Sequence, residues 1–152
     1  MVEATLSGAS HHILTNDYAS EWMGIEVLKI DDGHATIRMH LRQEMLNGFG
    51  MAHGGMIFAF GDTAFALACN PANPTPKQAA NITVASGVDI NFIKPAFQGQ
   101  VITAVANRRA STGRSGLYDI QIYAADPDAT PDTAPGELIA EFRGRSRTIS
   151  KK

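Results

Sequence analysis

The chain has 152 residues, of which 44% are hydrophobic and 18% charged, and its formal net charge is -2. This length and composition are typical of one soluble globular domain, so we expect a single domain over residues 1–152. The charge excludes a general attraction to nucleic acid or to membranes, so we expect neither as a partner.

The N-terminus and the cysteine count indicate a cytoplasmic protein. Residues 1–10 contain an acid, no basic cluster and no apolar run, so we expect no signal peptide. The single cysteine, Cys69, cannot form an internal disulfide, which fits a reducing compartment. We therefore expect a cytoplasmic location.

The first predicted elements are a helix and a hairpin. Residues 10–20 have apolar side chains at helical spacing, which predicts a short amphipathic helix capped by Ser10, within a helical extension over residues 1–20. Residues 23–30 and 35–41 alternate between apolar and polar side chains and predict two strands. Between them, Asp-Asp-Gly predicts a hairpin turn, since glycine supplies positive φ.

A central helix is predicted at residues 56–69, after a loop at 42–52 and before three prolines that forbid its continuation. Every residue in it is apolar or glycine except Asp62 and Thr63, so we expect a helix buried on all sides. Fourteen residues are too few to cross a bilayer. An ionised Asp62 is costly there unless it is hydrogen-bonded or lies at a pocket. It is therefore either tied to a neighbour such as Thr63 or functional, and we favour a function.

Four more strands are predicted after the helix. Residues 82–93, 101–110, 117–124 and 138–149 are rich in Val, Ile, Thr and Phe and are bounded by Gly, Pro or Asn. Residues 126–136 contain three Pro and three Asp, which predicts a mobile, solvated loop without chemistry. The predicted fold class is α+β, with one long helix on an antiparallel sheet of about five or six strands.

Several familiar catalytic motifs are missing. The sequence has no G-x-S-x-G elbow, no Walker loop and no G-x-G-x-x-G, which argues against a serine hydrolase and against a nucleotide-binding protein. One cysteine cannot build a zinc site, and the histidines show no metal-ligand spacing: His11, His12, His34, His40 and His53. We therefore expect no bound metal.

The start of the central helix is the first candidate site. His53, Gly54 and Gly55 precede the apolar run. A helix start offers unpaired N–H groups and a positive partial charge, which suit a carbonyl oxygen that becomes an oxyanion. Glycine also lets a ligand approach the backbone. The alternative is that the two glycines only permit a tight turn from the loop into the helix.

The spacing of Gly54 and Asp62 predicts a site shared between subunits. Eight residues separate them in the sequence, which in a helix corresponds to roughly 12 Å along the axis and about 80° around it. One carbonyl group cannot easily contact both. If the Gly54 N–H binds the oxyanion, the carboxylate acting on the same carbon should come from a second copy of the chain.

Four stretches resemble one known family. They are NGFGMAHGGMIFAFGDTAFALACN, DINFIKPAFQGQ, SGLYDIQIY and FRGRSRT. Together they resemble hotdog-fold acyl-CoA thioesterases, most closely the PaaI type of phenylacetate degradation, and the match runs over residues 21–149. The specific features are an Asn, the HGG triplet and an Asp around one helix, followed in order by F-x-[RK]-P on the next strand.

The resemblance implies an enzyme that hydrolyses acyl-CoA thioesters, with phenylacetyl-CoA or hydroxyphenylacetyl-CoA as the substrate. It implies no cofactor, because coenzyme A is part of the substrate. It also implies a hotdog fold, in which an antiparallel sheet wraps a helix, and a homodimer with shared active sites that pairs into a homotetramer.

The same resemblance assigns roles to four residues. By position, Asp62 is the catalytic carboxylate, Gly54 supplies the N–H that polarises the thioester carbonyl, and Asn47 lies near the thioester or the attacking water. His53 would hold the loop rather than move protons. Asp62 would act as a general base or as a nucleophile that forms a mixed anhydride, and the sequence does not separate the two.

A basic stretch suits the phosphates of coenzyme A. Residues 90–118 contain Lys94, Arg108, Arg109 and Arg114 and no acid. Lys94 stands where the family has arginine, and solvated surface charges are the alternative explanation of the stretch. Three further arginines, at positions 143, 145 and 147, alternate along the last strand and predict a solvent-facing row.

The remaining candidates are substrate-binding residues near these features. Ser115 lies with Arg114 in a glycine-flanked turn whose backbone N–H groups would add to phosphate binding. Phe49, in the loop before the helix, is a better candidate for an aryl pocket than aromatic residues at helical spacing, which usually belong to the core. The complete predicted set of substrate-binding residues is Gly55, Thr63, Phe49, Lys94, Arg114 and Ser115.

Two other functions stay open on the sequence. A non-catalytic acyl-CoA-binding module of the same fold would need an appended regulatory segment, for which we see no space. A hotdog hydratase or dehydratase would pair its acid with a histidine, and His53, nine residues before Asp62, does not supply that pair on one helix face.

Overall fold

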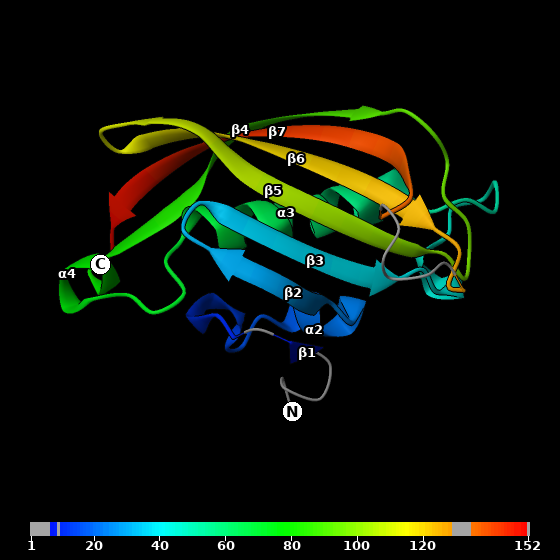
Figure 1. Ribbon diagram of the computed structural model, residues 1–152, viewed down its shortest axis with the longest axis horizontal. Coiled ribbons are helices and arrows are strands. Elements are labelled where there is room, and N and C mark those ends of the chain that lie inside the picture. Colours follow the sequence, from blue (N-terminus) through cyan, green and yellow to red (C-terminus); the bar gives the residue numbers. More distant parts are fainter. Residues whose placement is uncertain (1–6, 9, 129–134, 152) are drawn as a thin grey trace.

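In the computed structural model, which describes residues 7–8, 10–128 and 135–151, one long helix lies in the hollow of a curved sheet (Figure 1). The seven strands have the order β1-β2-β3-β5-β6-β7-β4. β1 pairs parallel with β2, and the other neighbours are antiparallel. The strands are β1 (Ser7–Gly8), β2 (Glu26–Asp31), β3 (His34–His40), β4 (Asn81–Phe92), β5 (Val101–Thr112), β6 (Ser115–Ala125) and β7 (Glu137–Ser150). The predicted α+β class and its strands are confirmed.

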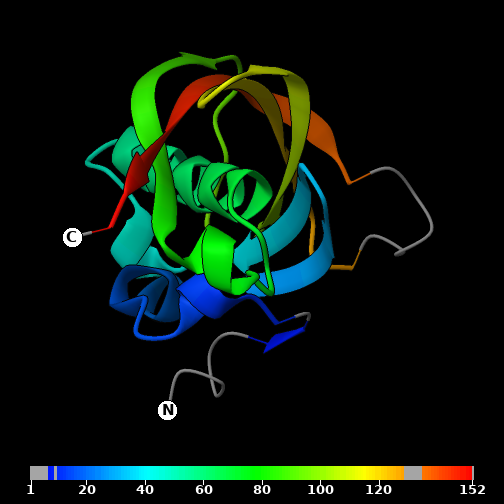
Figure 2. The same cartoon turned by 90° about the vertical axis from the view of Figure 1, so that its left-hand side faces the viewer.

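The central helix, α3, spans Gly54–Cys69, close to its predicted position. It packs closely on the sheet because glycines stand at the points of nearest approach. A Cβ at Gly61 would lie 2.9 Å from Cδ2 of Phe142, and one at Gly144 on β7 would lie 2.7 Å from Cζ of Phe65. Figure 2 shows the sheet curving around α3 in an end-on view.

The expectation that α3 is buried on all sides is wrong. Ile57, Phe60, Phe65 and other residues on the sheet side are buried, but Phe58 is 37% exposed. Met56, Ala59, Asp62, Thr63 and Ala66 are half-buried. The physical reason is that the sheet covers only one side of the helix. The other side of α3 stays partly open to solvent in the single chain.

The open side continues into an edge strand. Within the described residues β4 is paired only with β7, and none of its twelve residues is fully buried. Large apolar side chains are exposed on β4 and beside it: Ile82, Val84, Phe92, Ile93, Phe97 and Ile149. A long edge strand with apolar side chains is a surface that proteins normally cover.

The predicted N-terminal helix at residues 10–20 is wrong in its extent. A 3-10 turn at His12–Leu14 and the short helix α2 (Tyr18–Met23) replace it, and Asn16 between them has φ 65°. Asp17, rather than Ser10, caps α2 through its side chain. α2 therefore includes the first residue of the predicted strand, and β2 begins only at Glu26.

The remaining helical turns are short. A 3-10 turn at Gln43–Met45 interrupts the loop before α3, and α4 (Pro76–Ala79) begins with a capping box formed by Thr75 and Gln78. The loop predicted at 126–136 lies largely outside the described residues. Across the part of the chain that is described, no helix has the length and hydrophobicity that a membrane crossing requires.

Candidate active site

The start of α3 presents one unpaired backbone N–H group. His53 is the N-cap, and its Nδ1 accepts a hydrogen bond from the Gly55 N–H at 2.9 Å. The Gly54 N–H has no acceptor in the described part of the chain. The backbone N–H of His53 itself donates to the carbonyl of Met45 at 2.8 Å, which fixes the entry into the helix. The predicted loop-holding role of His53 agrees with these contacts, and Gly54 is left as the available donor.

Asn47 organises the glycine-rich loop that leads to this helix start. Its Oδ1 accepts hydrogen bonds from the N–H groups of Phe49 at 2.9 Å and Met51 at 3.2 Å. An Asn that bonds to backbone two residues ahead stabilises a turn of this kind. The side-chain oxygen of Asn47 is therefore engaged within the loop, its NH2 group makes no hydrogen bond to the described residues, and its contact with substrate stays a prediction. Phe49, at the tip of the loop, is 85% exposed.

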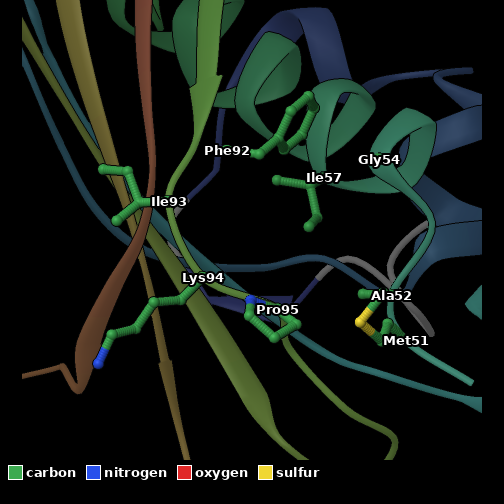
Figure 3. Close-up of a pocket in the computed structure, with 8 residues that line it drawn as sticks. All are labelled: Met51, Ala52, Gly54, Ile57, Phe92, Ile93, Lys94 and Pro95. Atoms are coloured by element: carbon green, nitrogen blue, oxygen red, sulfur yellow. The ribbon is translucent and has the colours of Figure 1, made fainter.

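An apolar pocket opens next to Gly54 (Figure 3). Its volume is about 300 Å³. A Cβ at Gly54 would lie 3.3 Å from Cζ of Phe92, so the glycine lets the ring and the pocket come close to the backbone. The lining is apolar apart from Lys94, and consists of Met51, Ala52, Gly54, Ile57, Phe92, Ile93, Lys94 and Pro95. A carbonyl group at the Gly54 N–H would thus have an apolar space beside it.

Asp62 lies two turns further along α3 and does not line this pocket. Its carboxyl group has no hydrogen bond or ion pair within the described residues, so the alternative explanation, a structural tie to Thr63, is not observed. No fully buried side-chain oxygen or nitrogen of the described chain lacks a partner, so the Asp62 oxygens reach the surface. Burial, and to a smaller extent the negative charge of Asp17, raise the pKa of Asp62. An unpaired, half-buried carboxyl of this kind is a functional-site candidate.

Thr63 is engaged elsewhere. Its Oγ1 lies 2.9 Å from the hydroxyl of Ser20, which donates in turn to Asp17 at 2.8 Å. Its predicted contact with substrate stays a prediction. The sequence analysis missed Asp17 and Ser20, although Asn16-Asp17 before a short apolar helix is a recognisable break and N-cap.

The basic stretch is neutralised by acids from distant parts of the chain. Arg108 makes two hydrogen bonds to Asp32, at 2.9 and 3.2 Å. Lys94 forms an ion pair with Glu137, and in Figure 3 its ammonium group points away from Gly54. Arg109 lies 3.4 Å from Asp119.

Arg114 differs from these three, since it has no ion pair among the described residues. It lies in the turn between β5 and β6. Its neighbour Ser115 borders a hollow of about 330 Å³ that is also lined by Ser86, Ser111, Thr112 and Ser146. The assignment of Arg114 and Ser115 to coenzyme A stays a prediction.

The row of arginines on β7 is exposed, as predicted. Arg143 donates to Asp119 at 2.7 Å, and Arg145 donates to Asp89 at 3.1 Å. These pairs stabilise a polar outer face of the sheet.

The described residues contain neither a readily ionised thiol nor a cluster of possible metal ligands. Burial raises the pKa of the Cys69 thiol to about 12, so the thiol is protonated at neutral pH and is a poor nucleophile. No group of three or more His, Cys, Asp or Glu side chains in the described ranges is placed to hold a metal ion. Asp62 and the amide of Gly54 stay the predicted catalytic groups.

Comparisons with known proteins agree with the motifs. The family model described as "Thioesterase superfamily" matches residues 49–130, more than half of the chain. The chain is 34% identical over 140 residues to the acyl-coenzyme A thioesterase PaaI of Escherichia coli K12, covering 92% of this chain and 89% of that protein.

Solved structures give the same result. The E. coli PaaI structure matches with a TM-score of 0.77 at 33% identity, covering 93% of this chain and 91% of that one. The TT0310 protein of Thermus thermophilus matches with a TM-score of 0.72 at 28% identity, covering 87% and 97%. A hypothetical thioesterase of Streptococcus pneumoniae, solved with coenzyme A, shares the fold with a TM-score of 0.66 at 19% identity, covering 84% and 90%. The fold implied by the motifs is confirmed.

Proposed function

Because this chain belongs to the thioesterase superfamily and is a thioester hydrolase of the hotdog fold, we propose that it hydrolyses acyl-CoA thioesters in a site shared by two subunits. The proposal depends on one observation: an unpaired N–H donor and an unpaired carboxyl group lie about two turns apart on α3. Gly54 offers a free N–H beside an apolar pocket, and Asp62 offers an unpaired carboxyl outside that pocket. Among the described residues, neither group has beside it the partner that thioester hydrolysis requires.

The proposed reaction follows from these two groups. The Gly54 N–H donates to the thioester oxygen and stabilises the negative charge that develops there. As general base, Asp62 takes a proton from water as the water oxygen attacks the carbonyl carbon, the C–S bond breaks, and the thiolate of coenzyme A leaves and takes up a proton. As nucleophile, the Asp62 carboxylate attacks the carbonyl carbon, the C–S bond breaks, and the thiolate of coenzyme A leaves and takes up a proton; water then hydrolyses the mixed anhydride to the free acid and the Asp62 carboxylate. A single turnover in ¹⁸O-labelled water separates the two, since only the anhydride route puts label into Asp62.

An arylacetyl group is the proposed acyl group. The pocket beside Gly54 is apolar apart from Lys94, which suits a phenyl ring. Its volume of about 300 Å³ leaves room for a ring. E. coli PaaI, whose solved structure is described as a protein of the phenylacetic acid degradation operon, adds support. We therefore propose phenylacetyl-CoA or hydroxyphenylacetyl-CoA as the substrate.

A second copy of the chain is the proposed source of the missing partner. The open side of α3 carries Phe58 and Asp62, and it adjoins the exposed apolar edge strand β4. Packing this surface against its twin would bury the apolar side chains and bring Asp62 of one subunit towards the pocket of the other. Two such dimers would form the proposed tetramer.

The test measures free-thiol release from a panel of acyl-CoAs, arylacetyl against straight-chain, with native protein and Asp62→Asn. We expect arylacetyl-CoA to be hydrolysed with the higher kcat/KM, and Asp62→Asn to lose at least about a hundredfold in kcat, as expected when a positioned acid-base group is removed. A mutant that is as active as the native protein would show that Asp62 is structural.

A further inference from the structure

A chain of hydrogen bonds joins the N-terminal helix to the residue next to Asp62. The carboxylate of Asp17 accepts from the Ser20 N–H at 3.1 Å with one oxygen and from the Ser20 hydroxyl at 2.8 Å with the other. The Ser20 hydroxyl also lies 2.9 Å from Oγ1 of Thr63. Ser20 is only 1% exposed, so these contacts are shielded from water. Asp17 is therefore held in one position relative to this part of α3.

The helix cap alone does not account for this arrangement. An N-cap needs one acceptor oxygen for a backbone N–H of the first turn, and Oδ1 of Asp17 already supplies it. The second oxygen is used for a buried hydroxyl that reaches across to α3. The result is a second carboxyl group that is tied to Thr63, the neighbour of Asp62 on α3, and its negative charge raises the pKa of Asp62.

We propose that Asp17 is a positioning residue for the proposed active site, held beside Asp62 by the hydrogen bonds that run through Ser20 and Thr63. The inference rests on the proposed role of Asp62 as the catalytic carboxylate. A negative charge near a carboxyl group disfavours the ionisation of that group. The fixed charge of Asp17 therefore makes Asp62 bind a proton more strongly, and a stronger base accepts a proton from water more readily.

No other charged group of the described residues raises the pKa of Asp62 in this way. The buried polar side chains of the described residues are those of His11, Ser20, Thr103 and Ser146, and none of them is a carboxylate, lysine or arginine. The other titratable groups nearby are His11 and Cys69 at the end of α3 and Tyr118 on β6. Burial lowers the pKa of His11 and raises the pKa values of Cys69 and Tyr118, so burial favours the uncharged form of each. The charge that acts on Asp62 comes from Asp17.

The test compares two substitutions that each remove one negative charge from the N-terminal segment. Asp17→Asn keeps an oxygen that can cap α2 but loses the charge, and Glu21→Gln removes a charge from α2 itself and serves as the matched control. The acid limb of the pH profile of kcat/KM reports the ionisation of Asp62 in the free enzyme. We expect this limb to move to lower pH in Asp17→Asn and to stay in place in Glu21→Gln. The kcat on the plateau should fall in Asp17→Asn alone, because the base is weaker.

A second readout does not depend on catalysis. The carboxyl ¹³C resonance of Asp62, assigned by its disappearance in Asp62→Asn, should titrate at lower pH in Asp17→Asn than in the native protein. If the Asp62 carboxyl titrates at the same pH in Asp17→Asn and Glu21→Gln, and the two variants have the same pH profile of kcat/KM, the inference is overturned. Full activity of Asp62→Asn would instead overturn the proposed function, and the titration would still report whether the two carboxyl groups interact.

Ser20→Ala gives an independent variant if Asp17→Asn does not fold. It keeps the charge of Asp17 but removes the hydroxyl that joins it to Thr63. Asp17 would then keep only the cap bond from the backbone N–H of residue 20, and its other oxygen would be released from α3, so we expect a smaller shift of the acid limb in the same direction. An unmoved acid limb in a folded Ser20→Ala protein would show that the hydrogen-bonded chain does not position Asp17.

Discussion

At the residue scale, Gly54 and Asp62 occupy one helix but face different surroundings. Gly54 begins α3 at the edge of an apolar pocket, whereas Asp62 lies on the side of the helix that the sheet leaves open. A structural aspartate would be expected to hydrogen-bond to its neighbours, and Asp62 does not. The half-burial of an unpaired carboxyl costs stability, which is expected at a site kept for function rather than for folding.

Gly54→Pro isolates the backbone N–H of this residue. Gly54 is the first residue of α3, where proline is well tolerated, and His53 before it has φ -64° and ψ 133°, a conformation that suits a residue preceding proline. We therefore expect Gly54→Pro to fold normally and to lose about 10²- to 10³-fold in kcat, the effect of removing one oxyanion donor. Circular dichroism measures whether the variant folds, and steady-state kinetics measure its kcat.

Gly54→Ala is the control for that substitution, because it keeps the N–H. Its Cβ would approach Phe92, whose side chain is 54% exposed and has room to shift. Gly54→Ala should therefore keep much more activity than Gly54→Pro. Equal losses in the two variants would indicate that space in the pocket, and not the donor, is what matters at this position.

At the scale of elements, the N-terminal segment is docked on the end of α3 by a buried histidine. Nε2 of His11 lies 2.9 Å from the carbonyl oxygen of Asn70, and Nδ1 accepts from the Ile13 N–H at 3.3 Å. Both bonds are satisfied only by the neutral ring with its proton on Nε2. Protonation of Nδ1 would remove the acceptor for Ile13. This agrees with the direction of the pKa of His11, which burial lowers.

Because the neutral ring of His11 holds the N-terminal segment on α3, the stability of the protein should depend on pH. A pKa that is lower in the folded state means that the unfolded chain binds more protons, so stability falls as the pH drops below the ordinary histidine range of about 6.5. We expect urea unfolding to show a greater loss of stability between pH 7.5 and 5.5 in the native protein than in His11→Gln. An exposed histidine elsewhere in the chain provides the control: His40→Gln should behave like the native protein, and a native-like slope in His11→Gln would contradict the assignment.

At the scale of the whole molecule, the surface formed by the open side of α3 and by β4 determines how two chains would meet. Ile82, Val84 and Phe92 on β4 and Phe58 on α3 are exposed in the single chain. Exposed apolar side chains along an edge strand are typical of an interface. The proposed assembly would therefore bury the same face of the helix that carries Asp62.

Mixing two inactive variants tests the shared site. If Gly54 and Asp62 of different subunits form each site, a dimer of one Gly54→Pro and one Asp62→Asn chain has one doubly changed site and one intact site. Random mixing of equal amounts should then restore about one quarter of the native activity, because half of the dimers are mixed and each has one of its two sites intact. Activity is measured after the subunits are exchanged and mixed dimers are verified by mass spectrometry. Verified mixed dimers without activity would place both groups of each site in one chain.

The sequence by itself determined the class of fold, the position of α3 and the main strands, and it singled out Gly54 and Asp62 as candidate site residues, because periodicity, turn residues and a contiguous motif are local properties of a chain. The break at Asn16 was also local and was missed. Only the tertiary structure decided that Asp32, Glu137 and Asp119 neutralise a stretch that is basic in sequence. It also decided that α3 keeps an open side. Both results depend on how the sheet curves and on which segments it brings together. A local sequence pattern does not contain that information.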